Sequence, residues 1–440
     1  MSEMHAETVG YVRDTMLPEQ DPPATSVGAI GWLRENLFSG WFNSVLTILS
    51  LIFIYWILSA LLPWFFSPTW EATSLNECRE ILAEMGREGH FGGACWGVIR
   101  DRWVQLLFGF YPSGLYWRPI LAFILLFVAL GPVLFSDYFP GKLIWFSAIY
   151  PFLMPWLLWG GSVWTPLLVI AGLGIGYGVF RVVAAAAGNL AGIIAAVIAA
   201  LAWWIFLVGP LSELIHSIIP AGLNSVDSRN FGGFMLSITI GVVAIAISLP
   251  LGIVLALGRR SDLLIVKSLC VGFIEFIRGV PLITLLFVAS TLLNIFMPPG
   301  TNFDIILRVI IMATLFASAY MAEVIRGGLA ALPKGQYEGA DSLGLDYWQA
   351  QRLIIMPQAL KISIPGIVST FIGLFKDTVL VSIIGLLDPL GLSNAIRADS
   401  DWNGIVWELY GFIALLFFIF CFGMSRYSMY LERKLQTGHR

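Results

Sequence analysis

A polar stretch of thirteen residues, KGQYEGADSLGLD at 334–346, lies between two strongly apolar runs of the sequence. It carries two carboxylates, Glu338 and Asp341, and two glycines that weaken a helix, Gly339 and Gly344. An ionised side chain costs roughly 2.5–3.5 kcal/mol at the centre of a membrane-spanning helix. We therefore expect the stretch to lie in water, where such a loop is suited to binding a partner protein.

Turn and cap signals predict that this loop contains two short helices. Pro333 and Gly335 favour a turn, and residues 336–343 favour a helix that stops at Gly344, since glycine readily takes the left-handed cap conformation. Asp346 begins a second helix, because Gln349 follows at the spacing of a capping box. Two short helices joined by a glycine turn make a rigid protrusion.

Proline and apolar residues define the rest of the loop. Pro357 restricts the residue before it, so we expect it to end the second helix. A flexible linker would lack apolar positions, but this loop has six, at Tyr337, Leu343, Leu345, Tyr347, Trp348 and Leu353. An amphipathic segment lying on the lipid surface remains the alternative interpretation.

Two charged residues interrupt an apolar run further upstream. Glu275 and Arg278 are three residues apart, and Gly279 and Pro281 predict a break in the helix just after them. Ionisable groups inside a membrane usually pair or face a protein interior. Two interpretations stay open: a place on a substrate path beside a broken helix, or a structural ion pair near the membrane boundary.

A second charged group lies later, at Lys376, Asp377 and Thr378. Together these residues offer both signs of charge, which is what a zwitterion requires. Neighbouring side chains point about 100° apart on a helix, so the two charges face one ligand squarely only if the helix is broken there. A buried pair that satisfies itself is the alternative.

Composition explains why these charges stand out. The chain has 440 residues, of which 58% are hydrophobic and 12% are charged, whereas soluble domains have roughly 25% charged residues. Crossing the bilayer takes roughly 20 apolar residues per helix, and the alternation of a β-barrel strand is absent from runs such as 236–257. The sequence therefore predicts an all-α integral membrane protein with about ten spans. We place them at roughly 44–66, 118–136, 142–160, 164–181, 190–208, 234–257, 268–296, 305–325, 363–385 and 405–425.

The positive charges of the loops predict the orientation. After residue 232, most bases fall in loops on one side, and basic loops face the cytoplasm. These bases are Arg259, Arg260, Lys267, Arg326, Lys334, Arg352, Lys361, Arg426, Arg433, Lys434 and Arg440. The polar loop and the C-terminus are therefore expected inside, and an even number of spans places the N-terminus inside and residues 67–117 outside.

The N-terminal region is expected to be peripheral. Residues 1–25 are polar and carry three prolines, which predicts a disordered cytoplasmic tail without a signal peptide. Residues 28–44 contain Trp32 and Trp41, and are either an amphipathic elbow at the membrane surface or simply the ragged start of the first span. We therefore treat 1–43 as tail and elbow.

The cysteines fit the predicted sides of the membrane. Cys78 and Cys95 lie in the outer segment, where an oxidising compartment permits a disulfide, although two cysteines on one exposed segment can also stay apart. Cys270 and Cys421 lie in spans and are expected to be packing residues. The pairing of Cys78 with Cys95 stays open at this stage.

The sequence divides near residue 230. Residues 44–230 are expected to form extension helices with the outer segment, and residues 231–440 a five-helix core that contains the polar loop, 326–361. His216 stands alone, and no metal site is expected.

The polar loop carries a motif that resembles the EAA loop of permease subunits of bacterial binding-protein-dependent ABC importers. Glu338-Gly339-Ala340 is followed after three residues by Gly344, and after nine more by the sequence IIMP that ends at Pro357. Gly339 replaces an alanine of the motif, and a methionine before the proline replaces a leucine.

Other stretches are similar to the polar amino-acid uptake branch of that family. They are 272–287, 320–336 and 371–385, and the resemblance covers residues 232 to the C-terminus. Val379 departs from it, since the branch has a serine there. The first half is similar to the M-type permease of general L-amino acid importers. The implied fold is a type I ABC importer permease core with added N-terminal helices.

The resemblance implies the role of the loop. In such importers the EAA loop is the coupling helix, which sits in a groove of a cytoplasmic ATPase dimer. Glu338 would anchor it, Ala340 would allow close approach and Gly344 would supply the turn. The matched coupling positions are Gln336, Glu338, Ala340, Asp341, Gly344 and Pro357. The substrate path is expected at Lys376, Asp377, Thr378, Glu275 and Arg278.

The same resemblance implies the partners. No phosphate loop of the form G-x-x-x-x-G-K-[ST] occurs in the sequence, so ATP and Mg²⁺ are expected on the partner ATPase and no cofactor on this chain. A periplasmic amino-acid-binding protein, a second related permease and the lipid bilayer are the other expected partners, and no nucleic acid is expected. The localisation is the bacterial inner membrane.

Two other functions were weighed. A secondary amino acid transporter driven by an ion gradient should show an internal repeat, and the first half contains nothing like residues 323–361. An enzyme needs converging catalytic groups, but the four histidines, at 5, 90, 216 and 439, are far apart in sequence. The secondary transporter is therefore the main alternative.

Overall fold

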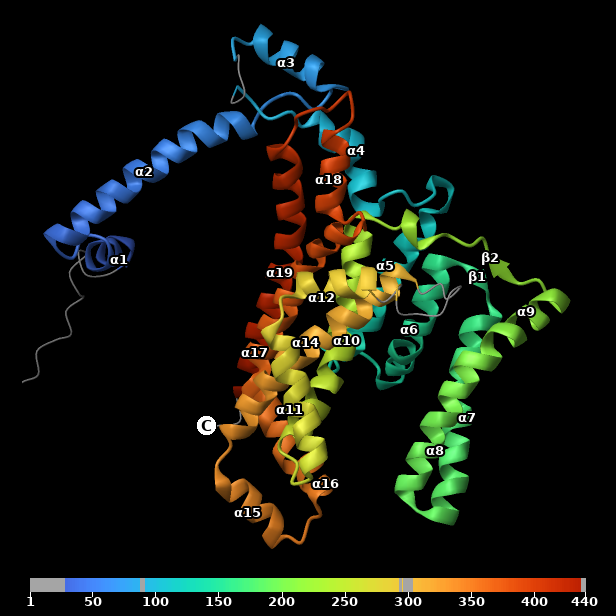
Figure 1. The fold of residues 1–440 in the computed structure, drawn as a ribbon. Helices are drawn as coiled ribbons and strands as arrows, with labels where there is room; N and C mark the ends of the chain where they lie inside the picture. The colour runs from blue at the N-terminus through green and yellow to red at the C-terminus, as the bar shows by residue number, and fades with distance from the viewer. Residues whose placement is uncertain (1–27, 88–91, 293–294, 296–303, 437–440) are drawn as a thin grey trace, which may run out of the picture. The chain divides into compact units, whose positions relative to one another are not determined.

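A computed structural model describes residues 28–87, 92–292, 295 and 304–436, and it is helical almost throughout (Figure 1). Within these residues the only sheet has two antiparallel strands, β1 (Gly161–Ser162) and β2 (Gly222–Leu223), with Gly161 opposite Leu223. The expected all-α class is confirmed. The predicted tail at 1–25 lies outside the described residues.

The helices follow the apolar runs of the sequence. The α-helices are α1 (Gly28–Asn36), α2 (Trp41–Phe65), α3 (Leu75–Glu84), α4 (Gly97–Phe108), α5 (Trp117–Leu134), α6 (Ile144–Trp159), α7 (Trp164–Ala187), α8 (Asn189–Ala202), α9 (Val208–Ile218), α10 (Gly233–Arg259), α11 (Leu264–Gly279), α12 (Leu282–Phe287), α14 (Ile305–Ala330), α15 (Lys334–Ser342), α16 (Tyr347–Ala350), α17 (Met356–Asp377), α18 (Pro389–Arg397) and α19 (Trp407–Gln436). Short 3-10 helices are η1 (Ser113–Leu115), η2 (Gly141–Leu143), η4 (Ser228–Asn230) and η7 (Thr378–Ile384), and π-helical turns are η3 (Trp203–Leu207), η5 (Val288–Leu292) and η6 (Gln351–Ile355).

The described helices confirm the predicted spans. Nine of them are long and apolar enough to cross a membrane, and a bent pair, 264–279 with 282–291, makes a tenth. The bend is 102° and falls at Gly279 and Pro281, where the sequence predicted a break. Pro281 has no amide hydrogen to donate, which interrupts the helical hydrogen bonds.

Contacts between residues divide the chain into two compact units, one of residues 1–68 with 82–94 and one of 69–81 with 95–440. The division predicted near residue 230 rests on the sequence and stays a prediction. In the first unit, α1 is separated from α2 by a bend at 37–40, and the Thr47 hydroxyl donates to the Leu37 carbonyl across it. No residue of the apolar helix α2 is buried.

In the second unit, α10, α14 and α17 pack closely through glycines. A Cβ on Gly252 of α10 would lie 2.6 Å from Met321 Cγ on α14, and one on Gly328 of α14 would lie 2.1 Å from Ser363 Oγ on α17. Close backbone approach maximises van der Waals contact between helices in lipid. These three helices therefore form the centre of the bundle.

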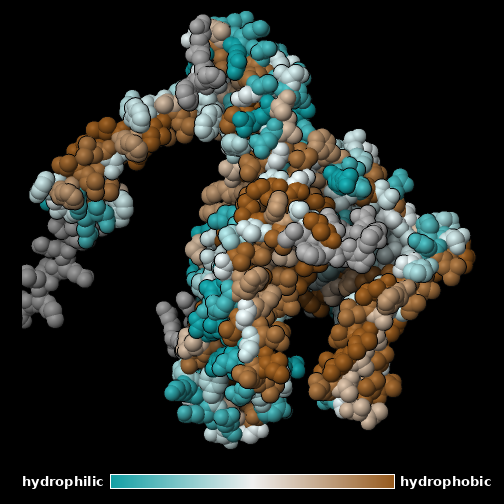
Figure 2. Space-filling model, viewed as in Figure 1, coloured by the Kyte–Doolittle hydropathy of each residue, from teal (hydrophilic) through white to brown (hydrophobic). Residues whose placement is uncertain are grey.

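Helices α7 and α8 form a long antiparallel hairpin in the same unit. Gly172 of α7 faces the indole rings of Trp203 and Trp204, whose Nε1–H groups donate to the carbonyls of Leu168 and Val169 at 2.8 and 3.0 Å. The outer surfaces of both helices are mostly apolar, as Figure 2 shows in brown. Such surfaces suit lipid or another membrane helix.

At the end of the second unit that carries α18, polar contacts join the outer segment to the core. Cys78 and Cys95 form a disulfide, which settles the pairing that the sequence left open. The backbone N–H of Cys95 donates to Glu408 Oε1 at 2.9 Å, and Trp402 Nε1 donates to Asp101 Oδ2 at 3.0 Å. We call this the α18 end.

The opposite end carries α15 and α16, and we call it the loop end (Figure 1). Here one prediction is wrong, because Pro357 does not end the second short helix. The chain passes from α16 through the π-helical turn η6 into α17, with Pro357 in the first turn of α17. A proline is tolerated there, since its missing N–H is not needed in the first turn.

Candidate functional site

The polar loop folds as two short helices around a glycine. Helix α15 ends at Ser342, and Gly344 has a φ of +68°, the left-handed conformation that its position predicted. The N–H of Leu345 donates to the carbonyl of Ala340 and closes the cap. Ala340 is buried, whereas Glu338 and Asp341 are exposed.

The second helix of the loop starts as predicted. Asp346 accepts from the N–H of Gln349 at 2.8 Å, and the Gln349 side chain accepts from the N–H of Asp346 at 3.1 Å, which is a complete capping box. Large apolar side chains nevertheless remain exposed here. They are Leu343, Tyr347, Trp348 and Leu353. A defined backbone with exposed apolar and acidic side chains is suited to docking.

Two side chains tie α15 to the spanning helices. The Tyr337 hydroxyl accepts from Arg260 Nη1 at 3.0 Å and donates to the Leu329 carbonyl at 3.3 Å. On the other side, Gln358 Nε2 of α17 donates to Gln336 Oε1 at 2.9 Å. The loop is thus attached to α10, α14 and α17.

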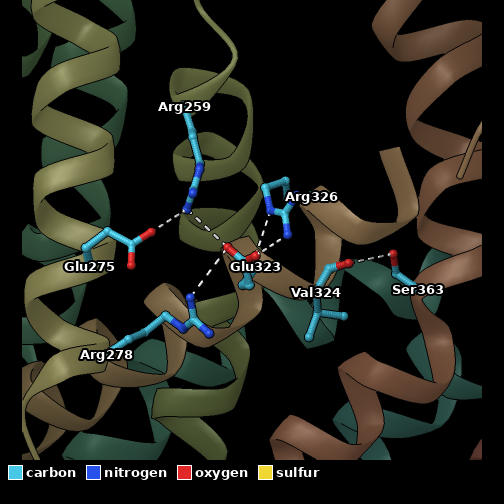
Figure 3. A network of polar contacts seen from close by, with 7 residues as sticks. All are labelled: Arg259, Glu275, Arg278, Glu323, Val324, Arg326 and Ser363. Atoms are coloured by element: carbon cyan, nitrogen blue, oxygen red, sulfur yellow. Dashed lines mark hydrogen bonds and ion pairs between the residues drawn. The ribbon is translucent and has the colours of Figure 1, made fainter. Parts of the chain in front are cut away.

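An ion-pair network lies beside the loop, drawn from α10, α11 and α14 (Figure 3). Arg259 Nη1 lies 3.0 Å from Glu275 Oε1 and 3.1 Å from Glu323 Oε2. Glu323 also accepts from Arg326 Nε at 2.7 Å and lies 3.6 Å from Arg278 Nη1. Glu323 is the shared acceptor that joins three arginines.

The network changes the interpretation of Glu275 and Arg278. Among the described residues no ion pair joins the two to each other; each pairs with a residue of another helix, Glu275 with Arg259 and Arg278 with Glu323. The Arg278 guanidinium also lies over the Tyr320 ring, 5.5 Å from its centre. These contacts favour the structural-pair interpretation.

Lys376, Asp377 and Thr378 lie where α17 passes directly into the 3-10 helix η7, so the helix changes type here but is not broken, as both charges facing one ligand would require. Lys376 is exposed and lines a groove of about 470 Å³ between α17 and α19. The groove is lined by Pro365, Val368, Ser369, Ile372, Gly373, Lys376, Ser425, Ser428, Met429 and Glu432. Thr378 is buried, and its hydroxyl donates to the Phe375 carbonyl at 2.8 Å.

Sequence reasoning did not assign a site role to Arg259, Arg260 or Tyr337, and it gave Glu323 only as a weaker candidate, expected to be a helix-contact or loop-anchoring residue. The two arginines counted only as loop charges, and Tyr337 only as an apolar residue of the loop. The signal that could have drawn attention to the two arginines is that they are adjacent bases at the C-terminal end of α10, where cations are favourable.

At the α18 end, Asp388 is a buried carboxylate that starts α18 by accepting from the N–H groups of Leu390 and Gly391. Burial raises the pKa of Asp388 to about 6, and the hydrogen bonds from the backbone offset only part of that rise.

The sequence of this chain is similar to those of known proteins. A family model described as "Binding-protein-dependent transport system inner membrane component" matches residues 248–436. The glutamate/glutamine/aspartate/asparagine transport system permease protein BztC of Rhodobacter capsulatus is 60% identical over 433 residues, which cover 98% of this chain and 99% of that protein. The inner membrane amino-acid ABC transporter permease protein YhdY of Escherichia coli is 39% identical over 425 residues, 96% of this chain and 97% of that protein.

One solved structure is also similar, the "Crystal structure of an amino acid ABC transporter with histidines". The match covers 46% of this chain and 91% of the chain in that structure, with 30% sequence identity and a TM-score of 0.41. The matched family model and these two relatives define a membrane transport permease. The chain belongs to the family of permease subunits of amino acid ABC importers, and it is a multi-pass inner membrane protein with the type I importer fold.

Proposed function

We propose that this permease couples ATP hydrolysis by a partner ATPase to the import of glutamate, glutamine, aspartate and asparagine. The rigid loop of α15, Gly344 and α16 carries the proposal, because it is exposed at its tip and attached directly to the spanning helices. Glu338 and Asp341 face solvent there, beside Leu343 and Trp348.

Within the loop, each of the remaining matched residues has a structural task that supports docking. Gln336 fixes α15 to α17, and buried Ala340 lets α15 lie close to the loop that follows. Gly344 sets the turn with its positive φ, and Pro357 begins α17. Glu338, whose side chain is exposed, is the anchor in the ATPase groove.

The proposed substrates are those in the name of the relative that is 60% identical to this chain. They are two acidic amino acids, glutamate and aspartate, and their amides, glutamine and asparagine. The groove beside Lys376 supports a substrate path, because its ammonium suits a carboxylate and its serines suit an amide. Asp377, next in the chain, suits the substrate's ammonium. The pairs of Glu275 and Arg278 support a role beside that path rather than on it.

The remaining assembly is proposed from the same family. A periplasmic amino-acid-binding protein delivers substrate, a second related permease completes the pathway, and the ATPase dimer binds ATP and Mg²⁺, so this chain is not itself an enzyme. The basic loop end faces the cytoplasm with both termini, and the disulfide at the α18 end faces the periplasm.

Replacing Glu338 by lysine tests the docking role. We expect Glu338→Lys to insert normally but to lose co-purification of the ATPase, or to lose uptake, since a cation would replace the anchoring carboxylate. Glu80→Lys is the matched control, because Glu80 is an exposed acid on α3 in the outer segment. Normal ATPase recovery together with normal uptake in Glu338→Lys would contradict the proposal.

The ion-gradient alternative is tested in vesicles. We expect no uptake when an ion gradient is imposed and ATP is absent, because the proposed energy source is the partner ATPase. Strong uptake under those conditions would instead establish a secondary transporter.

A further inference from the structure

Helix α10 ends in two adjacent arginines whose side chains reach different elements. Arg259 donates to Glu275 on α11 and to Glu323 on α14, as Figure 3 shows. Arg260 donates to the Tyr337 hydroxyl on α15, and its guanidinium also lies over the Tyr337 ring, 5.5 Å from the centre. Side chains of neighbouring helical residues diverge by about 100°, which allows one helix end to hold two groups of helices.

The contact with Tyr337 matters because α15 is not packed flush against the bundle at this point. A crevice of about 380 Å³ separates them, lined by Arg260, Leu329, Ala330, Leu332, Lys334, Tyr337 and Glu338. Tyr337 crosses this region and bonds both to Arg260 and to the Leu329 carbonyl at the end of α14. Displacement of α15 on this side therefore reaches the bundle through the Tyr337 side chain.

We propose that Arg260 is a positioning residue that transmits movement of α15 to α10, and that Arg259 distributes the movement to α11 and α14. The inference rests on the proposed function, since it takes α15 as the helix that the ATPase moves. It adds a specific route at the α10 side, in parallel with the Gln336–Gln358 bond to α17.

The chemistry of both arginines suits transmission. A guanidinium is a planar fork that donates in fixed directions and stacks on an aromatic ring, so Arg260 holds the orientation of Tyr337 as well as its distance. The partners of Arg259 are partly exposed, at 53% for the Glu275 side chain and 23% for Glu323. Partly exposed ion pairs add little stability, so the pairs can exchange during a transport cycle.

Two substitutions test the route in the full complex, with ATPase, companion permease and binding protein in proteoliposomes. Arg260→Gln removes the charged fork, and Tyr337→Phe removes only the hydroxyl. In each we expect the ATPase to co-purify in normal amount and ATP hydrolysis to continue, while the amount of glutamate taken up per ATP hydrolysed falls several-fold. Lys267→Gln is the matched control, an exposed cation near the start of α11, and we expect it to keep the normal ratio.

A double-mutant cycle separates this route from general damage. Because Arg260 acts on α15 through the Tyr337 hydroxyl, Arg260→Gln should lower uptake per ATP much less in a Tyr337→Phe background than in the unmodified chain, although Tyr337→Phe also removes the bond to the Leu329 carbonyl. Arg260→Lys should restore part of the ratio, since it keeps the charge but loses the fork. A ratio unchanged in Tyr337→Phe, or effects of the two substitutions that simply multiply, would overturn the inference.

The outcome for the unmodified chain distinguishes the two proposals. If the unmodified permease recovers no ATPase, the proposed function fails. If it couples normally and Arg260→Gln and Tyr337→Phe couple equally well, the docking role stands and the route through Arg260 fails. Should Arg260→Gln not assemble, Tyr337→Phe alone decides, because it removes one hydroxyl from a half-buried ring.

Discussion

The two ends of the larger unit both have partly exposed ion pairs, such as Arg102–Asp399 at the α18 end, but among the described residues only the α18 end also has a disulfide. At the α18 end the Cys78–Cys95 disulfide is reinforced by the buried carboxylate of Glu408, which accepts from the Cys95 N–H. At the loop end, partly exposed ion pairs such as Arg259–Glu323, the Tyr337 hydroxyl and the Gln336–Gln358 hydrogen bond make the connections.

The two ends of the bundle are therefore expected to differ in how readily their contacts open. Breaking a buried hydrogen bond leaves an unsatisfied group, and a disulfide does not exchange with water at all. A partly exposed ion pair, in contrast, can open at little cost because water replaces the partner. The α18 end is thus built to stay fixed, and the loop end to change its contacts.

The largest expected effect comes from removing the disulfide. Cys78→Ser with Cys95→Ser should lower the free energy of unfolding by about 3 kcal/mol, because the bond closes a short loop in the unfolded chain; the two cysteines are 17 residues apart. Unfolding in mixed micelles measures it, with Cys270→Ala and Cys421→Ala as the control for free cysteines. Equal stability of the two double variants would mean that the disulfide does not stabilise the α18 end.

Overpacking the centre of the bundle ranks next. Gly328→Leu should cost about 2 kcal/mol, since a Cβ there already lies 2.1 Å from Ser363 Oγ and 2.5 Å from the Ala359 carbonyl oxygen. Gly327→Leu is the control, because a Cβ at Gly327 has no neighbour within 4 Å. A similar loss in both variants would mean that the α14–α17 contact is looser than described.

Asp388 gives a pH dependence to the α18 end. The pKa of Asp388 in the folded chain, about 6, exceeds its unfolded value, so its stabilising contribution is complete at low pH and is lost as the pH rises through 6. We expect unfolding free energy to fall by about 1 kcal/mol from pH 5 to pH 8. Asp388→Asn should lack this slope, and an identical slope in that variant would assign it to another group.

The smallest effect is expected at the loop end. Glu275→Gln should lower the free energy of unfolding by less than about 1 kcal/mol, because its one ion pair is half-exposed. Thermal unfolding in detergent at low and high salt measures it, with Lys267→Gln as the control. A loss as large as that of the disulfide would show that this end is as fixed as the other.

The local signals in the sequence predicted most of the fold. The apolar runs marked the spans, Gly279 with Pro281 marked the bend, and Gly344 and Asp346 marked the loop helices. Each of these depends on the chain's own backbone or on hydrophobicity. Such signals can be recognised in the sequence without knowing which helices are neighbours in the fold.

What the sequence did not predict depends on distant partners. Spacing suggested that Glu275 would pair with Arg278, but Arg259 from α10 and Glu323 from α14 are the actual partners. Pro357 was expected to end a helix, yet the π-helical turn before it lets the helix continue. The coupling and substrate residues remain predictions, because their roles depend on partners that a single chain does not contain.

The continuity of α16, η6, α17 and η7 has a mechanical consequence. The 38 residues from Tyr347 to Ile384 form one continuous helical run, which at about 1.5 Å per residue is nearly twice as long as the hydrocarbon layer is thick. Gly328 of α14 and Gly366 of α17 bring α14 close to this run partway along, so the contact can act as a fulcrum. A push on the end near Tyr347 then swings the end near Ile384 in the opposite direction.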